Sequence, residues 1–127
     1  MREQDKKIIH VKKILSGISP EIRTLYEGQH FKNAERTSDE HAAVGKSWKE
    51  YWQIFTQDDF PNTCPFCGEP LSENEIDGCH IKIHGIGLLG QWSTKKYIIP
   101  GHQGCNIQLG EEFDARITVN AVEAIEK

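Results

Sequence analysis

The sequence lacks any apolar run long enough to cross a membrane, and its first residues lack the charged, apolar and small-residue pattern of a secretory signal. It also lacks internal repeats and low-complexity tracts. These absences predict a cytoplasmic protein that does not interact with membranes. With 127 residues, of which 37% are hydrophobic, the chain is long enough to bury one core of modest size.

An excess of basic residues is missing as well. The net charge is −4 at pH 7 with neutral histidines, and it is unevenly distributed. Residues 1–60 are neutral overall, whereas residues 61–127 carry five Lys and Arg against nine Asp and Glu. Surfaces that bind nucleic-acid phosphates are usually basic. The composition therefore argues against non-specific DNA binding by the second half of the chain.

Cysteine is scarce, but the spacing of three of the four cysteines is informative. Cys64 and Cys67 stand two residues apart, and His102 and Cys105 repeat this spacing. In a cytosolic chain such cysteines are metal ligands or free thiols rather than disulfides. A tight turn aims both ligands of a pair at one ion, and Cys₃His is a standard closed zinc site. The two pairs predict a structural zinc, with a free-thiol protein and a chance histidine as the alternative.

The segment between the two pairs has the pattern of a strand. Over residues 78–84 the apolar Cys79, Ile81 and Ile83 alternate with His80, Lys82 and His84. This alternation predicts that Cys79 is a buried thiol and not a zinc ligand. Residues 94–99 form a plausible returning strand, and a helix is expected to begin near the second ligand pair. A ligand turn, a hairpin and a helix in this order form a treble clef.

The N-terminal part has helical patterns. Residues 3–15 have apolar side chains at helical spacing, and Ser19-Pro20-Glu21 predicts the start of a second helix. Residues 32–46 are polar with weak patterning and are expected to be mostly loop. Ser47 and Glu50 form a capping box at the start of a third helix. The aromatic stripe on that helix predicts a core face rather than a platform for stacking bases, and consists of Trp48, Tyr51, Trp52 and Phe55.

These patterns together predict an α+β fold. A helical segment, residues 1–57, would pack on a zinc-stabilised treble-clef (ββα) module, residues 58–127, that carries a C-terminal extension. The two parts are expected to form one compact domain.

Residues 60 to 112 resemble the zinc-containing branch of the HNH endonucleases. Three patterns carry the resemblance: the Cys64–Cys67 pair, the strand Gly78-Cys79-His80-Ile81, and the run from Tyr97 to Asn106. The resemblance implies a metal-dependent nuclease that uses magnesium or manganese beside the structural zinc. It implies that His80 activates water and that Asn106 binds the catalytic metal. Cys79 and Tyr97 stand where the family has Asp and Asn.

Two functional hypotheses remain open at this point. In the nuclease hypothesis, phosphates of the nucleic acid would contact Lys82, Lys95 and Lys96. In the second hypothesis the chain is a non-catalytic treble-clef zinc protein that binds a protein or nucleic-acid partner. His80 is then a surface histidine, and Asn106 bonds its own backbone at a helix start.

Overall fold

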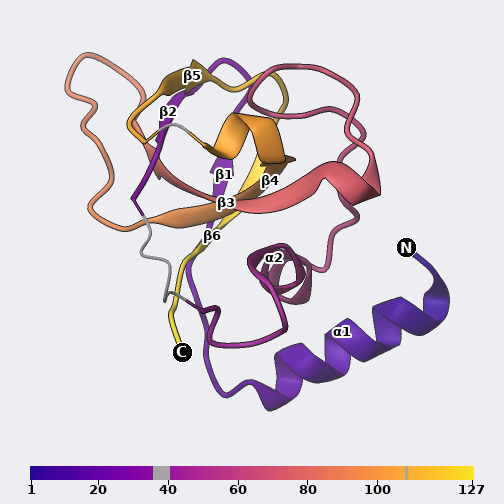
Figure 1. Ribbon diagram of the computed structural model, residues 1–127. Coiled ribbons are helices and arrows are strands. Elements are labelled where there is room, and N and C mark those ends of the chain that lie inside the picture. The colour runs from indigo at the N-terminus through magenta and orange to yellow at the C-terminus, as the bar shows by residue number, and fades with distance from the viewer. Residues whose placement is uncertain (36–40, 108) are drawn as a thin grey trace.

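The computed structural model describes residues 1–35, 41–107 and 109–127. In this part of the chain the dominant element is a curled sheet of six antiparallel strands (Figure 1). The strands lie in the order β1-β6-β4-β3-β2-β5, so that β1 and β5 form the edges. Their bounds are β1 Ile22–Leu25, β2 His30–Asn33, β3 Ile76–Ile83, β4 Tyr97–His102, β5 Glu112–Asp114 and β6 Val119–Glu123.

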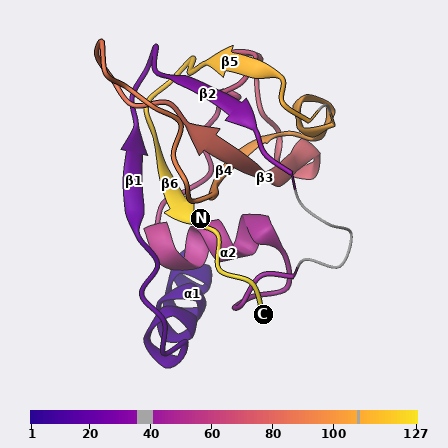
Figure 2. The same ribbon diagram turned by 90° about the vertical axis from the view of Figure 1, so that its left-hand side faces the viewer.

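Two α-helices are present in the described part of the chain, α1 (Glu3–Leu15) and α2 (Trp48–Thr56), besides the 3₁₀ turns η1 (Glu73–Glu75) and η2 (Gln103–Asn106). Helix α2 covers one face of the sheet, and α1 packs on the far side of α2 (Figures 1 and 2). No helix among the described residues combines the length and the apolar character needed to span a bilayer.

Helix α2 forms the centre of the core, as its sequence predicts. The Ser47 hydroxyl caps it by accepting a hydrogen bond from the Glu50 N–H at 3.2 Å. The Trp52 indole N–H donates to the Asn120 carbonyl of β6 at 2.7 Å, so this large polar group is satisfied although it is buried. The whole aromatic stripe is buried, which confirms its prediction as a core face: Trp48, Tyr51, Trp52 and Phe55.

The first turn of α2 lies directly on β3 at Gly78. A Cβ atom at this glycine would be 2.4 Å from the carbonyl carbon of Trp48 and 2.5 Å from the Lys49 nitrogen. Two residues further along the same face, the His80 ring meets the Trp48 indole edge-on at 4.6 Å between centroids. His80 is only 2% exposed. The His80 side of β3 is therefore covered by α2 at this point and not open to solvent.

The opposite face of the sheet is covered by the loop that carries the first cysteine pair. Phe66 of this loop is 2% exposed and packs edge-on against Phe31 of β2 and Phe113 of β5, at centroid distances of 4.9 and 5.0 Å. Aromatic pairs favour this geometry. The cysteine loop is therefore part of the core and not an appendage to it.

The predicted fold class is wrong. The described residues form a six-stranded curled sheet with two α-helices, and not a helical N-terminal part on a ββα module. Strands from both sides of residue 57 pair in this one sheet: β1 and β2 come from the first segment, and β3 to β6 from the second. The hairpin β3–β4 matches the predicted strands 78–84 and 94–99 to within a few residues.

The expected helix after Pro20 is a strand. Ile22 and Thr24 are β-branched and favour strands, and the segment pairs with β6, so that the tertiary partner outweighs the helix-start signal of Ser19-Pro20. The expected helix after the second ligand pair is the single turn η2, and the chain then continues into β5 and β6. Of the predicted loop 32–46, residues 32 and 33 belong to β2, and residues 36–40 lie outside the described residues.

The crossing at Gly78 gives a first prediction. Gly78→Ala places a methyl group against the backbone of α2, which cannot move without disturbing the buried aromatic stripe, and we expect a loss of roughly 1–3 kcal/mol or more in the free energy of unfolding. Gly104→Ala is the matched control, because a Cβ there meets nothing within 4 Å. Urea unfolding followed by circular dichroism measures both, and equal stability of the two variants would contradict the close crossing.

The edge strand β5 is held by a histidine between two carboxylates. The two ring nitrogens of His30 contact Glu112 at 2.6 Å and Asp114 at 2.8 Å, across the β2–β5 pairing. These hydrogen bonds, that to Glu112 above all, raise the pKa of His30 above 6.5. The folded state therefore binds the His30 proton more tightly than the unfolded state does.

This contact predicts a pH dependence of stability. The contribution is complete below the unfolded pKa of 6.5 and is lost as the pH rises through the raised folded value. His30→Gln should therefore destabilise more at about pH 6 than at about pH 9, by at most about 1 kcal/mol because the side chain is partly exposed. His10→Gln on α1 is the control. A His30→Gln effect that does not change between these pH values would contradict the prediction.

Candidate metal centre

The first ligand pair is presented by a tight turn. The Cys64 N–H donates to the Glu69 carbonyl at 2.8 Å, and the Gly68 N–H donates back to the Cys64 carbonyl at 2.9 Å. Gly68 has φ +79°, a left-handed conformation that glycine adopts without strain. The sequence Cys-x-x-Cys-Gly therefore closes the loop with both thiols on its inner side.

The second pair stands where β4 ends. His102 is the last residue of β4, and Cys105 follows in η2. The His102 N–H points at the Cys64 sulfur at 3.4 Å, which joins the two pairs directly. Turn η2 is fixed from a distant strand, because the Asn33 side chain of β2 donates to the Cys105 carbonyl at 2.8 Å.

The structure brings the four predicted ligands together. The three cysteine sulfurs and a ring nitrogen of His102 all lie within 4.8 Å of one another. Ligands at zinc distances of about 2.0–2.3 Å around a tetrahedral ion would lie about 3.3–3.8 Å apart. The cluster is therefore compatible with a structural metal such as zinc after only a small contraction.

The orientation of His102 fits a metal ligand. Its Nδ1 lies 3.3 Å from the Cys67 sulfur, inside the cluster. Its Nε2 points outward, 3.0 Å from the Pro70 carbonyl and 3.4 Å from the Glu75 carboxylate. A ligating histidine commonly donates its other N–H to a carbonyl or a carboxylate, which fixes the tautomer and the ring. Nδ1 is accordingly the nitrogen that is free to face an ion.

The electrostatics of the four-residue cluster also favour a metal ion. Burial, reinforced by the neighbouring Cys64 and Cys67, raises the pKa of the Cys105 thiol to about 12. The thiolate form of Cys105 is therefore disfavoured in the absence of a compensating cation. The adjacent Cys67 also raises the pKa of His102. A divalent ion supplies the missing positive charge and is held by deprotonated thiols.

The fourth cysteine stays outside this cluster. Cys79 lies on β3 with no exposed surface, and its thiol donates to the Asp77 carbonyl at 3.6 Å. Its sulfur would also touch a Cβ placed on Gly101, at 3.3 Å. Cys79 is thus a packing residue of the sheet face that Phe66 covers, as the alternation in the sequence predicts.

The two predicted catalytic side chains lie on different sides of the sheet. Asn106 of η2 points its amide towards the Asp77 carboxylate, at 3.4 Å. Asp77 and His80 are three residues apart on β3, and side chains alternate along a strand, so they face opposite ways. His80 packs under Trp48 on the α2 side. The structure therefore brings Asn106 to Asp77 and does not bring it to His80.

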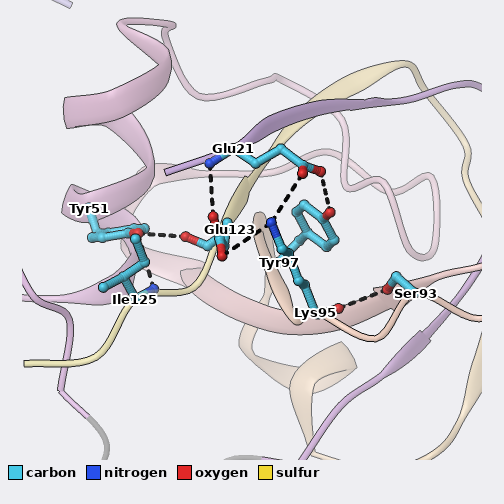
Figure 3. A network of polar contacts seen from close by, with 7 residues as sticks. All are labelled: Glu21, Tyr51, Ser93, Lys95, Tyr97, Glu123 and Ile125. Atoms are coloured by element: carbon cyan, nitrogen blue, oxygen red, sulfur yellow. Dashed lines mark hydrogen bonds and ion pairs between the residues drawn. The ribbon is translucent and has the colours of Figure 1, made fainter. Parts of the chain in front are cut away.

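The predicted phosphate-binding lysines are already engaged within the chain or dispersed. Lys95 pairs with the carboxylates of Glu21 at 3.3 Å and Glu123 at 3.5 Å (Figure 3). The Lys96 ammonium group donates to the Glu35 carbonyl. Lys82 is half-buried on β3, elsewhere on the sheet.

Tyr97, which stands where the family has Asn, belongs to the same network as Lys95. Its hydroxyl donates to the Glu21 carboxylate, as Figure 3 shows. Beside it, the Tyr51 hydroxyl donates to the Glu123 carbonyl at 2.5 Å and accepts from the Ile125 N–H at 3.1 Å. These contacts tie β1, β4, β6 and α2 together, which is a structural role.

Sequence reasoning missed the residues that orient the ligands. Glu75 and Pro70 were not predicted, although an acidic residue between two ligand pairs is a usable signal for a partner of the metal-binding histidine. Asn33 gave no signal, because the strand that carries it was expected to be loop. No family model, no curated protein and no solved structure matches this chain.

The metal centre gives the third prediction. Cys64→Ser should lower the metal content from one zinc per chain and reduce stability by several kcal/mol, because metal binding contributes folding free energy at such sites. Cys79→Ser is the matched control and should keep the full zinc content. Elemental analysis and thermal unfolding with and without a chelator measure both. A chain free of zinc when purified from zinc-containing medium would contradict the prediction.

Proposed function

We propose that this chain is a zinc-stabilised protein-binding domain without catalytic activity of its own. The observation that carries the proposal is the closed donor set. Cys64, Cys67, Cys105 and the Nδ1 atom of His102 would fill all four positions of a tetrahedral zinc. No position is then left for a water or a substrate, which catalytic zinc sites keep open.

The zinc has a mechanical role in this proposal. It would fasten the cysteine loop to the end of β4, a strand that pairs with both β3 and β6. The loop carries Phe66 into the core, so a metal at this point also secures the packing against Phe31 and Phe113. A bound metal would add folding stability that a small core, with its modest apolar burial, does not supply by itself.

A hydrolytic role finds less support. Phosphodiester hydrolysis needs an activated water and a cation at the same phosphate. His80 is 2% exposed and covered by Trp48, and Asn106 lies towards the opposite face of β3. A general base has to reach its water within hydrogen-bond distance. The nuclease hypothesis, with magnesium or manganese as its second metal, stays a prediction.

A protein partner fits the surface better than a nucleic acid does. Lys95 and Lys96 are engaged by other groups of the chain, and residues 61–127 are acidic. Several of the large apolar side chains that are exposed lie instead on α1 and in the loop after β3. Exposed apolar side chains that lie close together mark interaction surfaces more often than single exposed side chains do. They comprise Ile8, Val11, Ile14 and Leu15 on α1, and Ile86, Leu88 and Leu89 in the loop.

The fourth prediction separates the two hypotheses. The zinc-loaded chain should not cleave plasmid DNA or single-stranded DNA and RNA oligonucleotides in magnesium or manganese, because His80 cannot reach a water. The assay compares wild type with His80→Ala and Asn106→Ala, each checked for zinc content and circular dichroism. Cleavage that is lost in folded, zinc-loaded His80→Ala would overturn the proposal and establish the nuclease hypothesis.

A further inference from the structure

The three cysteines of the cluster differ in their access to solvent. Cys64 has no exposed surface, whereas Cys67 and Cys105 are half-buried. The Cys64 sulfur also has a backbone partner, because the His102 N–H points at it at 3.4 Å. A cysteine is oxidised only where the oxidant reaches its sulfur. The exposure of these residues therefore favours Cys67 and Cys105 over Cys64 as sites of oxidation.

The same two cysteines are also close to each other. The ligand atoms of the cluster lie within 4.8 Å of one another, and the Cys105 thiol is hydrogen-bonded to Cys67 and to Cys64. A disulfide needs about 2.05 Å between its sulfurs, so the approach still required is at most about 3 Å. A change of side-chain rotamer covers such a distance. The pair is thus close enough to form a disulfide without a rearrangement of the sheet.

We propose that Cys67 and Cys105 form a reversible disulfide when the chain meets hydrogen peroxide. One of the two sulfurs attacks a peroxide oxygen, the O–O bond breaks, and a sulfenic acid and one water form. The second sulfur then attacks the first, the S–O bond breaks, and a second water leaves. In sum the two thiols give up two electrons and two protons, which convert hydrogen peroxide into two molecules of water.

The disulfide removes two of the four donors of the metal centre. Cys64 and His102 remain, and two donors do not complete the tetrahedral set of a structural zinc. The oxidised chain therefore loses the metal. The inference rests on the proposed zinc site for this step alone, since the disulfide itself needs only the two sulfurs and the oxidant.

The disulfide would fasten the same two parts of the fold as the metal. Cys67 directly follows the buried Phe66 in the cysteine loop, and the Cys105 carbonyl is held to β2 by the Asn33 side chain at 2.8 Å. A bond between them closes the stretch of chain from 67 to 105 and so constrains the unfolded state. A bond between Cys64 and Cys67 would join two residues of one turn and leave η2 loose. Oxidation is thus an exchange of one fastening for another, with the fold kept.

Disulfide mapping of the wild-type chain as purified tests the pairing. The chain is treated with hydrogen peroxide, free thiols are alkylated, and the peptides are identified by mass spectrometry. Chymotrypsin is the protease of choice because it cleaves after Phe66 and so separates Cys64 from Cys67. We expect one bond, between Cys67 and Cys105, which dithiothreitol reverses. A bond that includes Cys64 or Cys79, or sulfinic acid without a disulfide, would overturn the proposal.

Zinc release is measured on the same samples with a chromophoric chelator. One zinc ion should be released per disulfide formed. Cys79→Ser is the matched control, because Cys79 is a buried thiol outside the cluster, and it should form the bond and release zinc with the same yield as wild type. Disulfide formation with zinc retained, or a control that forms no bond, would contradict the assignment.

Thermal unfolding with excess chelator tests the exchange of fastenings. The oxidised chain should melt roughly 5 °C or more above the reduced chain, because the disulfide constrains the unfolded state. An oxidised chain that melts no higher than the reduced, metal-free chain would show that the bond does not replace the metal. The two proposals fail separately. A chain that forms the bond but contains no zinc contradicts only the metal centre, and a zinc-loaded chain that forms no bond contradicts only the disulfide.

Discussion

Three thiols crowded at one point, with Cys64 buried and Cys67 and Cys105 half-buried, are the constraint on which the rest of the structure depends. Burial and the neighbouring sulfurs raise the pKa of Cys105 to about 12, so its thiolate is disfavoured unless a cation lies beside it. The elements that meet there come from distant parts of the sequence: the cysteine loop, the end of β4, and β2 through Asn33. Releasing the cluster would therefore loosen the sheet and the aromatic packing of Phe66 together.

The part of β3 on which the resemblance to nucleases depends has a packing role in this structure. Gly78 lets the first turn of α2 lie on the sheet, and His80 fills the space under Trp48. A histidine can act as a general base only on a face that water and substrate can reach. Here that face is covered by a helix from a part of the chain that the resemblance does not include. The motif alone therefore does not determine the chemistry.

The sequence predicted the elements whose signals are local. The capping box at Ser47 and the aromatic stripe located α2, and the two Cys/His pairs located the cluster that could hold a metal. Strands β1, β2, β5 and β6 were missed because each has only three to five residues, too few for a clear alternation. Their existence depends on partners far along the chain, as with Ile22 and Val122. The cover over His80 could not be foreseen for the same reason.

The pairing of β1 with β6 also constrains the order in which the fold is assembled. Ile22 emerges from the ribosome long before Val122, its partner in the sheet. Until β6 arrives, both edges of β1 are unpaired, and contacts of such large sequence separation form slowly. The β3–β4 hairpin and all four residues of the Cys/His cluster are complete before β6 is made. Strand β1 therefore has to wait for its partner strand, although it is made before any other strand.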